Sequence, residues 1–239
     1  MKHTEHSKSR SAAWTEPAFT VTDTARYLQL NPTTVRSWFV GESRHGKQTF
    51  RPVLRLADRR QSFLSFQNLV EVYVLSALRR THSVKLAAIR QALQFLERRW
   101  KTAHPLATGQ VLTDGVEVFI EEYGRLISAS AEGQTAMRDI LGRYLTRIEY
   151  QDGLPIRLFP LTRPADESPA SRDDVPFAIS IDPRLAFGKP CIAGTGIPAA
   201  VVAARFTAGE GIESLAKDYR RAPGDIEEAI RFDRLTRAA

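Results

Sequence analysis

The sequence predicts an α+β protein that is mainly helical, with a larger N-terminal region and a small C-terminal domain. Apolar residues recur at helical spacing through residues 65–80, 84–100 and 132–149, which accounts for the helical majority. Shorter runs in which apolar and polar residues alternate predict a few strands. Residues 160–176, PLTRPADESPASRDDVP, combine four prolines with few apolar residues and therefore predict a connector outside any core.

These patterns divide the chain into five parts. Residues 1–18 are polar and lack periodicity, so we expect them to be disordered. We expect a helix-turn-helix with a basic ribbon at 19–80 and an α+β middle region packed with it at 81–160. A linker at 161–176 then leads to a small helix-turn-helix-like domain with short strands at 177–239.

Basic residues are concentrated in the first part of the chain. The whole chain has 34 Lys and Arg against 27 Asp and Glu, a net charge of +7. Residues 1–100 carry 17 basic and 7 acidic residues, whereas residues 101–239 are slightly acidic. This asymmetry is typical of a protein whose N-terminal region meets a polyanion. Arginine accounts for 27 of the 34 basic residues, which suits bidentate contacts to phosphate and guanine, although a genomic preference for arginine codons would give the same count.

Composition argues against membrane and disulfide-rich classes. No apolar run approaches the roughly 18 residues of a membrane span, and the polar N-terminus predicts no secretory signal. We therefore expect a cytoplasmic protein that does not contact a membrane. Cys191 is the only cysteine, which excludes an intramolecular disulfide, and we expect it to be a small packed residue.

Catalytic and metal-binding patterns are poorly represented. The five histidines form no H-E-x-x-H motif and stand beside no cysteine or carboxylate at ligand spacing. The neighbouring pairs Glu121-Glu122 and Asp173-Asp174 would point apart on a strand or loop, and Gly188-Lys189 lacks the frame of a phosphate loop. We therefore expect no enzyme, no catalytic residue, no metal and no cofactor.

Residues 21–40 match the spacing of a helix-turn-helix unit. Ala25 supplies the small residue of the first helix, and Val35 and Trp38 supply the inward face of the second. Gln29 departs from the pattern, because glycine is usual at that turn position. The outward residues of the second helix are expected to bind DNA through base edges and phosphates: Thr33, Thr34, Arg36 and Ser37. An ordinary helical hairpin with a surface arginine is the alternative.

A basic two-stranded ribbon is predicted after this unit, over residues 44–64 with a turn near Asp58. Beside a helix-turn-helix, such a ribbon would be a wing that lays cations against phosphate or into the minor groove. The DNA-binding residues expected from this segment are Arg44, Lys47, Arg51 and Arg55. The same charges would also suit a solvated edge strand that resists aggregation.

The middle region is predicted to contain helices and one hairpin. The helix at 65–80 is apolar nearly all round, so either a complete core within one chain or a dimer interface would cover it. Residues 110–128 contain Asp114-Gly115 between valine-rich runs and are predicted as a hairpin. The remaining elements expected here are helices at 84–100 and 132–149 and a strand at 155–159.

The C-terminal domain is predicted from glycine-rich turns and short helical periods. Gly188, Gly194 and Gly196 permit tight turns between short strands. The expected elements are a strand at 179–181 and helices near 198–208, 212–219 and 224–236.

The N-terminal segment resembles the winged helix-turn-helix of MerR-like regulators. The resemblance rests on VTDTARYLQLNPTTVRSWFVG and the following FRPVLRLADRRQSFLSFQNLVEVYVLSALRR. It implies a winged helix-turn-helix fold. We expect a homodimer that binds an operator with half-sites about 34 Å apart or a multiple of that distance.

Residues 181–233 are similar to a small domain common in bacterial antitoxins, whose signature is IDP…GKP.I.GTRIP. The matching residues are Ile181-Asp182-Pro183, Gly188-Lys189-Pro190, Ile192, Gly194-Thr195 and Ile197-Pro198. Gly196 stands where the family usually has arginine, so this chain lacks any contact that such an arginine makes. Taken together, the two segments resemble VapB-type antitoxins of toxin–antitoxin modules. The resemblance implies an autoregulator of its own operon that also neutralises a PIN-domain ribonuclease toxin by direct binding.

An antitoxin often blocks the carboxylate-lined site of a ribonuclease with a basic side chain. The candidate toxin-binding residues are Arg220, Arg221, Arg231 and Arg234, although surface solvation explains them equally well. Two other functions are also compatible with the sequence. One is a free-standing MerR-like transcriptional regulator, and the other is a protein-interaction module that does not bind DNA.

Overall fold

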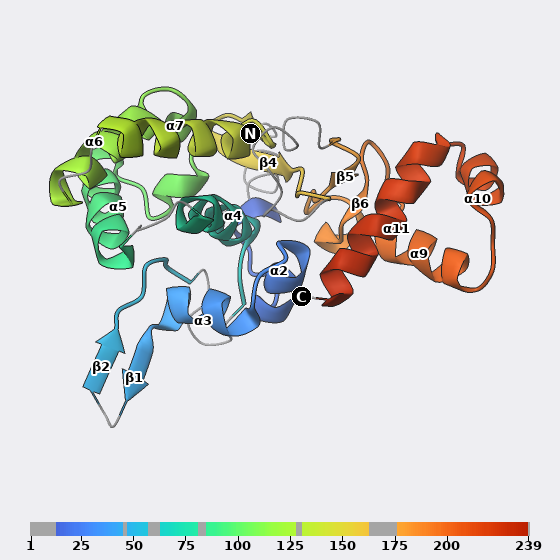
Figure 1. The fold of residues 1–239 in the computed structure, drawn as a ribbon, viewed down its shortest axis with the longest axis horizontal. Coiled ribbons are helices and arrows are strands. Elements are labelled where there is room, and N and C mark those ends of the chain that lie inside the picture. The colour runs from blue at the N-terminus through green and yellow to red at the C-terminus, as the bar shows by residue number, and fades with distance from the viewer. Residues whose placement is uncertain are drawn as a thin grey trace, which may run out of the picture. The chain divides into compact units, whose positions relative to one another are not determined.

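A computed structural model of the chain describes residues 13–44, 47–56, 63–80, 85–127, 131–162 and 176–238. These residues form two compact units. The N-terminal unit takes in residues up to Thr24 and from Pro32 to Ile156, and the C-terminal unit takes in Ala25–Asn31 and residues from Arg157 onward. Helices predominate and the sheets have two strands each (Figure 1), which confirms the predicted α+β, mainly helical class.

The predicted helix-turn-helix consists of helix α2, Val21–Tyr27, and helix α3, Pro32–Val40. Thr20 caps α2, because its hydroxyl accepts a hydrogen bond from the backbone N–H of Asp23 at 2.9 Å. Gln29 has a φ of +55°, so this residue adopts the left-handed conformation that explains why glycine is usual at this turn position.

The apolar face of the helix-turn-helix is buried, as the spacing of its residues predicts. Ala25 and Val35 have no exposed surface, and Trp38 is 2% exposed. Gly41 ends α3 with a φ of +78°, and a Cβ atom at this position would collide with the carbonyl oxygen of Phe50. Glycine is therefore required at this helix end, both for its backbone conformation and for the close approach of the backbone at Phe50.

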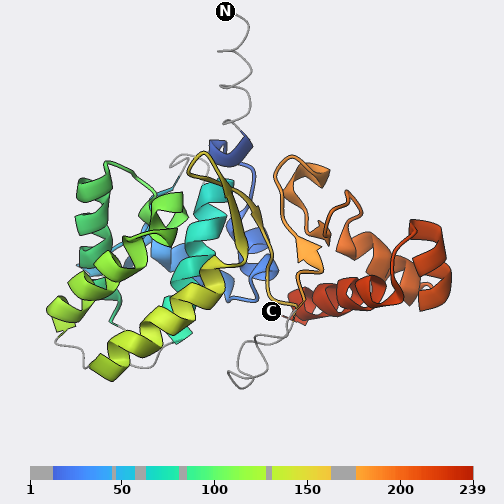
Figure 2. The same cartoon turned by 90° about the horizontal axis from the view of Figure 1, so that it is seen from above.

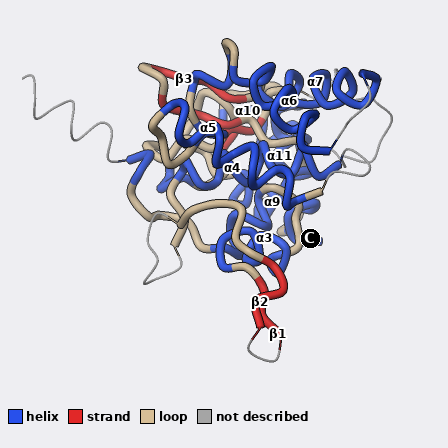
Figure 3. Tube along the Cα trace, turned by 90° about the vertical axis from the view of Figure 1, so that its left-hand side faces the viewer, coloured by secondary structure: helices blue, strands red, loops and turns tan. Residues whose placement is uncertain are grey.

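A short antiparallel hairpin follows α3 and extends away from it (Figure 3). Its strands are β1, Glu42–Arg44, and β2, Lys47–Phe50, with Arg44 opposite Lys47. The prediction of a ribbon over 44–64 was therefore wrong in register and length, because the hairpin turns between residues 44 and 47. Pro52 lacks the amide hydrogen that would continue the ladder. Asp58, where the turn was expected, lies outside the described residues.

Helix α4, Phe66–Arg80, is the centre of the N-terminal unit. From Asn68 to Leu78 every residue is buried, and most of the apolar ones have no exposed surface at all. Helix α7, Ala131–Leu145, packs against α4 on one side, and the 3-10 turn η1, Pro105–Ala107, packs against it elsewhere. A single chain thus buries the apolar residues of α4 from Phe66 to Leu78, so its apolar surface needs no dimer partner.

The predicted hairpin at 110–128 was wrong, because the described residues of this segment form a 3-10 turn and a helix. A 3-10 turn, η2 at Gly109–Leu112, leads into helix α6, Gly115–Ile127. Phe119, Ile120 and Tyr123 are each at most 2% exposed and lie on one helical face. Gly115 allows α6 to begin against helix α5, Leu86–Trp100, because a Cβ atom there would collide with the ring of Trp100.

Helix α5, Leu86–Trp100, packs against α6, and α6 packs against α7 (Figure 2). After α7 a hairpin forms from β3, Ile148–Gln151, and β4, Leu154–Leu158, which places the predicted strand within one residue. Asp152 and Gly153 both have positive φ between these strands, as a tight two-residue turn requires.

Within residues 176–238, the C-terminal unit contains three α-helices and a two-stranded sheet close to the predicted positions. Strands β5, Ile179–Ser180, and β6, Cys191–Ile192, pair antiparallel. The helices are α9, Ala199–Thr207, α10, Ile212–Tyr219, and α11, Pro223–Ala238, and both α9 and α10 pack on α11 (Figure 1). Of the three expected turn glycines, Gly188 and Gly194 have positive φ and Gly196 does not. Within the described residues of both units, no helix combines the length and apolarity that a membrane span demands.

Candidate nucleic-acid interface

The exposed face of α3 carries the residues that the sequence assigned to DNA. Thr33, Thr34 and Arg36 are exposed, and Ser37 is half-buried. The Ser37 hydroxyl donates a hydrogen bond to the backbone carbonyl of Thr34 at 2.9 Å, so this hydroxyl already has a partner on its own helix. Because Val35 on the same helix is fully buried, α3 has one side anchored in the core and one side open to a ligand.

The structure separates the predicted wing residues into two groups. Arg44 and Lys47 stand opposite each other at the end of the β1–β2 hairpin. Arg51 and Arg55 lie beyond the hairpin, in the loop that leads from β2 toward α4, and both are exposed. The description of Arg51 and Arg55 as hairpin residues was therefore wrong.

Arg36, Arg51 and Arg55 meet at one surface groove of about 620 Å³. This cationic groove has walls from α3, the loop at residues 51–56 and α5. Its polar lining consists of Arg36, Arg51, Arg55, Arg90, Gln94 and Glu97. Its apolar lining includes Phe39, Val53, Leu54 and Leu93, which are all at most 7% exposed. Four arginines and one glutamate therefore line the groove, above a floor of buried apolar residues.

Arg90 holds the loop in place from α5. Its Nε donates a hydrogen bond to the carbonyl oxygen of Pro52 at 2.9 Å, and a terminal nitrogen donates to that of Arg51 at 2.8 Å. Its guanidinium also lies 5.4 Å from the ring centre of Phe50, in a cation–π contact. Burial and the neighbouring charge of Arg51 lower the pKa of Arg90. Arg90 is therefore a positioning residue that fixes where the hairpin ends and the groove begins.

Arg55 is the residue of the groove that has a counterion. Its guanidinium forms an ion pair with Glu97 at 2.6 Å, and 55% of the Arg55 side chain remains exposed. The backbone carbonyl of Arg55 accepts a hydrogen bond from the side-chain amide of Asn68 at 2.7 Å. These two contacts fix the groove loop to α5 and to α4.

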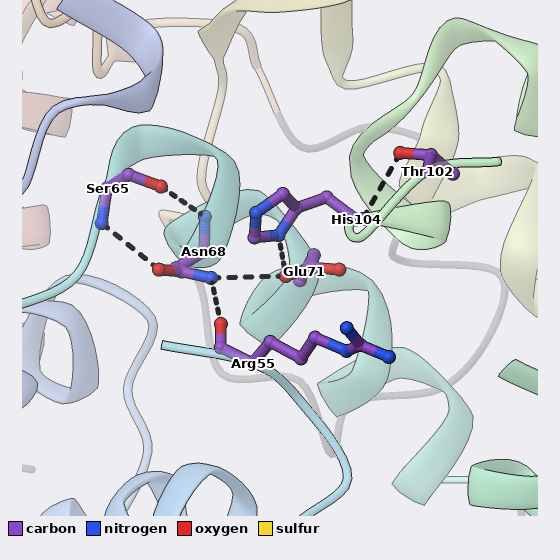
Figure 4. A network of polar contacts seen from close by, with 6 residues as sticks. All are labelled: Arg55, Ser65, Asn68, Glu71, Thr102 and His104. Atoms are coloured by element: carbon purple, nitrogen blue, oxygen red, sulfur yellow. Dashed lines mark hydrogen bonds and ion pairs between the residues drawn. The ribbon is translucent and has the colours of Figure 1, made fainter. Parts of the chain in front are cut away.

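Asn68 belongs to a buried polar network around Glu71 of α4 (Figure 4). The Asn68 amide also donates to the Glu71 carboxylate at 3.2 Å, and Nδ1 of His104 lies 2.9 Å from the same carboxylate oxygen. The Glu71 side chain is 1% exposed and that of His104 is 20% exposed. A carboxylate in this position needs such partners, because an unpaired buried charge is costly.

Both ionisable groups of this network bind a proton more tightly than usual. Burial raises the pKa of Glu71, although the contacts with His104 and Asn68 act in the opposite direction. Burial alone would lower the pKa of His104, but its hydrogen bond to Glu71 and the charge of Glu71 raise it above the ordinary value. The protonation of this pair therefore depends on its burial and on the contact between the two side chains.

The C-terminal unit uses its signature residues to build its own framework. The carboxylate of Asp182, 1% exposed, accepts hydrogen bonds from the backbone N–H of Arg184 and from its guanidinium at 2.7 to 2.9 Å. Burial alone would raise the pKa of Asp182, but these hydrogen bonds hold it below the ordinary value. Cys191 is buried, its thiol donates to the Lys189 carbonyl, and burial raises its pKa to about 11. This cysteine has the environment of a packed residue, as expected.

Three of the four candidate toxin-binding arginines contact side chains of their own unit. Arg221 pairs with Asp225 at 2.9 Å and Arg231 with Glu228 at 3.3 Å. The guanidinium of Arg234 lies 5.6 Å from the ring centre of Phe206. Arg220 is exposed at the end of α10 with a φ of +53°. Arg231 and Arg234 share a groove of about 480 Å³ whose lining includes neither Arg220 nor Arg221, so these four candidates do not form one cluster.

Sequence reasoning missed Arg90, Glu97 and the pair of Glu71 and His104. One signal was available, because Glu71 is the only acidic or basic residue from position 66 to 78 of an otherwise buried helix, and such a charge demands a partner. The identity of that partner, and the role of Arg90, depend on tertiary contacts between distant segments. Within the described residues, no group of three or more His, Cys, Asp and Glu side chains could hold a metal ion.

Two family models match separate parts of the chain. Residues 17–93 match the family described as "Putative DNA-binding HTH domain", which spans α2, α3, the hairpin, α4 and the first half of α5. Residues 179–232 match the family described as "Protein of unknown function (DUF433)", which covers most of the C-terminal unit.

Known proteins match nearly the whole chain. The chain is 26% identical over 233 residues to the "Putative antitoxin VapB45" of Mycobacterium tuberculosis strain H37Rv, covering 90% of this chain and 92% of that protein. The crystal structure of Rv2018 from Mycobacterium tuberculosis superposes with a TM-score of 0.67 at 24% identity, over 90% of this chain and 97% of that one. The second match supports the fold. The chain is thus similar along almost its entire length to a protein named as a putative VapB antitoxin. This chain itself has a segment that matches a helix-turn-helix family near its N-terminus and a segment that matches DUF433 near its C-terminus. These matches confirm the resemblance drawn from the sequence.

Proposed function

We propose that this protein is a DNA-binding antitoxin that represses its own operon and neutralises a PIN-domain ribonuclease toxin. The observation that carries the DNA-binding part is the open face of α3 with Arg36, which adjoins a groove lined by four guanidinium groups. A helix held from behind by Val35 and Trp38, with polar side chains on its free side, can enter a major groove without disturbing its core. The family matches and the similarity to an antitoxin support the same assignment.

In this proposal the protein acts in the cytoplasm as a homodimer. It works by binding alone, without a catalytic step or a cofactor. Two copies would present two α3 helices to half-sites about 34 Å apart, or a multiple of that distance. Since α4 is buried within one chain, the dimer interface must lie on another surface.

A promoter-binding assay tests the regulatory part. The full chain should bind a duplex that contains its own promoter at least 100-fold more tightly than an unrelated duplex at physiological salt. Footprinting should show two protected half-sites at the spacing given above. Equal affinity for both duplexes would contradict operator recognition.

An RNA-cleavage assay tests the antitoxin part. The chain should form a stable complex with the ribonuclease encoded next to its gene and stop that enzyme from cleaving RNA. Promoter binding without any inhibition of the ribonuclease would favour a free-standing regulator. Inhibition without promoter binding would favour a pure protein-interaction module.

A further inference from the structure

We propose that the cationic groove holds the sugar-phosphate backbone of the bound duplex, so that α5 takes part in DNA binding together with α3. This inference rests on the DNA binding proposed above and assigns a new part of the surface to it. It gives Gln94 a place beside the phosphates and gives Glu97 the role of a counterion that competes with them for Arg55.

The charge of the groove is the first argument. Four guanidinium groups against one carboxylate leave a formal excess of three positive charges on one small surface. Arg36 and Arg51 are exposed, and among the described residues neither side chain has a hydrogen-bond or ion-pair partner. Arg51 also lies close enough to Arg90 for its charge to lower the pKa of Arg90. An anion bound here would relieve this repulsion, which no side chain of the groove relieves fully.

The position of the groove is the second argument. Arg36 belongs to the exposed face of α3 and also lines the groove, so the two surfaces are continuous. A helix whose free face meets the bases lies between two phosphate backbones, and most protein–DNA hydrogen bonds go to those phosphates and sugars. A backbone that passes α3 would therefore enter the groove. A free anion would have no need of this continuity.

The rigidity of the groove is the third argument. Arg90 fixes the backbone of Arg51 and Pro52, and Asn68 fixes the backbone of Arg55. The floor residues Val53 and Leu54 are buried. The backbone that carries Arg51 and Arg55 therefore loses little conformational freedom on binding, which favours the complex.

The ion pair of Arg55 and Glu97 controls how strongly this surface attracts phosphate. Glu97 holds the guanidinium at 2.6 Å, while more than half of the Arg55 side chain stays open to solvent. A phosphate that approaches Arg55 is attracted by the arginine and repelled by the glutamate. Glu97 therefore limits the affinity of the groove, and its removal should strengthen DNA binding.

Charge changes on α5 of the full chain test the proposal. Gln94 and Gln91 are both exposed residues of α5, but only Gln94 lines the groove, so Gln94→Glu and Gln91→Glu form a matched pair. Binding to the promoter duplex and to an unrelated duplex is measured by fluorescence anisotropy between 50 and 200 mM salt. Melting temperatures of all variants are compared to verify that each one folds.

We expect Gln94→Glu to make the plot of log affinity against log salt less steep by about 0.9 and to weaken binding about threefold at low salt. Gln91→Glu should leave both the steepness and the affinity nearly unchanged. Glu97→Gln should increase the slope by about 0.9 and tighten binding by about threefold. Equal effects of the two glutamine variants, or weaker binding by a folded Glu97→Gln, would overturn the groove while leaving DNA binding intact. A wild-type chain that binds neither duplex would overturn the proposed function and the groove together.

Discussion

Most arginines beside α3 and most arginines of the C-terminal helices differ in how far they are paired with carboxylates of the same chain. Beside α3, Arg36 and Arg51 are exposed, and the groove that they line has one carboxylate for four arginines. On α9, by contrast, Arg205 pairs with Glu210 and with Asp218, each at 2.6 Å, and its guanidinium lies 5.0 Å from the ring centre of Tyr219. Arg36 and Arg51 are thus accessible to an external anion, whereas Arg205 is already paired with carboxylates of its own unit.

The same contrast extends along α11. Arg231 and Arg237 each pair with a carboxylate about one turn away on α11. Arg221, which precedes the helix, pairs with Asp225 in its first turn. A phosphate would have to displace these carboxylates and would meet their negative charge. We therefore expect the C-terminal unit to contribute little to DNA binding.

The largest expected effect concerns the network that supports the groove loop. Glu71→Ala leaves His104 and Asn68 without their buried partner, and loss of one member of a buried ion pair costs about 3–5 kcal/mol in free energy of unfolding. The exposed pair on the C-terminal unit gives the control, because Asp218→Ala should cost less than about 1 kcal/mol. Urea unfolding measures both values. A cost below about 1 kcal/mol for Glu71→Ala would show that this network does not support the loop.

A second prediction compares the cations of the two units directly. The double change Arg51→Ala with Arg55→Ala should reduce the log–log salt slope of promoter binding by about 1.8, because two phosphate contacts are lost. Arg231→Ala with Arg234→Ala removes the same charge from the C-terminal unit and should leave the slope nearly unchanged. Equal slopes for both double variants would mean that net charge alone, and no defined surface, governs the binding.

The third prediction concerns pH. The pKa values of Glu71 and His104 are both raised in the folded chain, so the folded state binds more protons than the unfolded state. Their contribution to stability is therefore fully present below the unfolded pKa values and is lost as pH rises through the folded ones. Thermal unfolding should show a lower melting temperature at pH 8 than at pH 6, and His104→Gln should flatten this dependence. The same dependence in the variant would assign it to other groups.

The smallest expected effect is at the position where the family usually has arginine. Gly196 does not have positive φ, and an added Cβ atom there would meet nothing within 4 Å. Gly196→Arg should therefore change the free energy of unfolding by less than about 0.5 kcal/mol. Gly194→Arg, at a φ of +74°, is the matched control and should destabilise the chain by about 1–2 kcal/mol. Equal losses in urea unfolding would indicate that the turn excludes side chains at both positions.

The sequence predicted those elements whose local pattern and tertiary environment agree. The burial of Ala25, Val35 and Trp38 followed from spacing alone, and the three C-terminal helices lie close to their expected positions. The prediction of a hairpin at 110–128 failed because Asp114-Gly115 is also compatible with the start of a helix. Burial of the helical face with Phe119 and Tyr123 favours the helix. The Asp-Gly pair that does form a hairpin turn is Asp152-Gly153.

Long-range contacts set the limit of that reasoning. The hairpin ends where Arg90, 39 residues beyond Arg51, binds the backbone of the loop. His104 reaches Glu71 across a separation of 33 residues. Neither pairing has a signature in local spacing, so the sequence could indicate cations near α3 but could not show that they surround a common groove.

The most direct test of this account is the effect of Arg36→Ala on promoter affinity, measured beside Arg231→Ala. Arg36 should contact base edges or clamp the major groove, so its removal should weaken promoter binding by about 5- to 150-fold and reduce the preference over unrelated duplex. Arg231→Ala should change affinity by less than about twofold, because its guanidinium is already paired with Glu228. A loss of less than about threefold for a folded Arg36→Ala variant, or equal losses for both variants, would contradict the claim that the surface of α3 grips DNA.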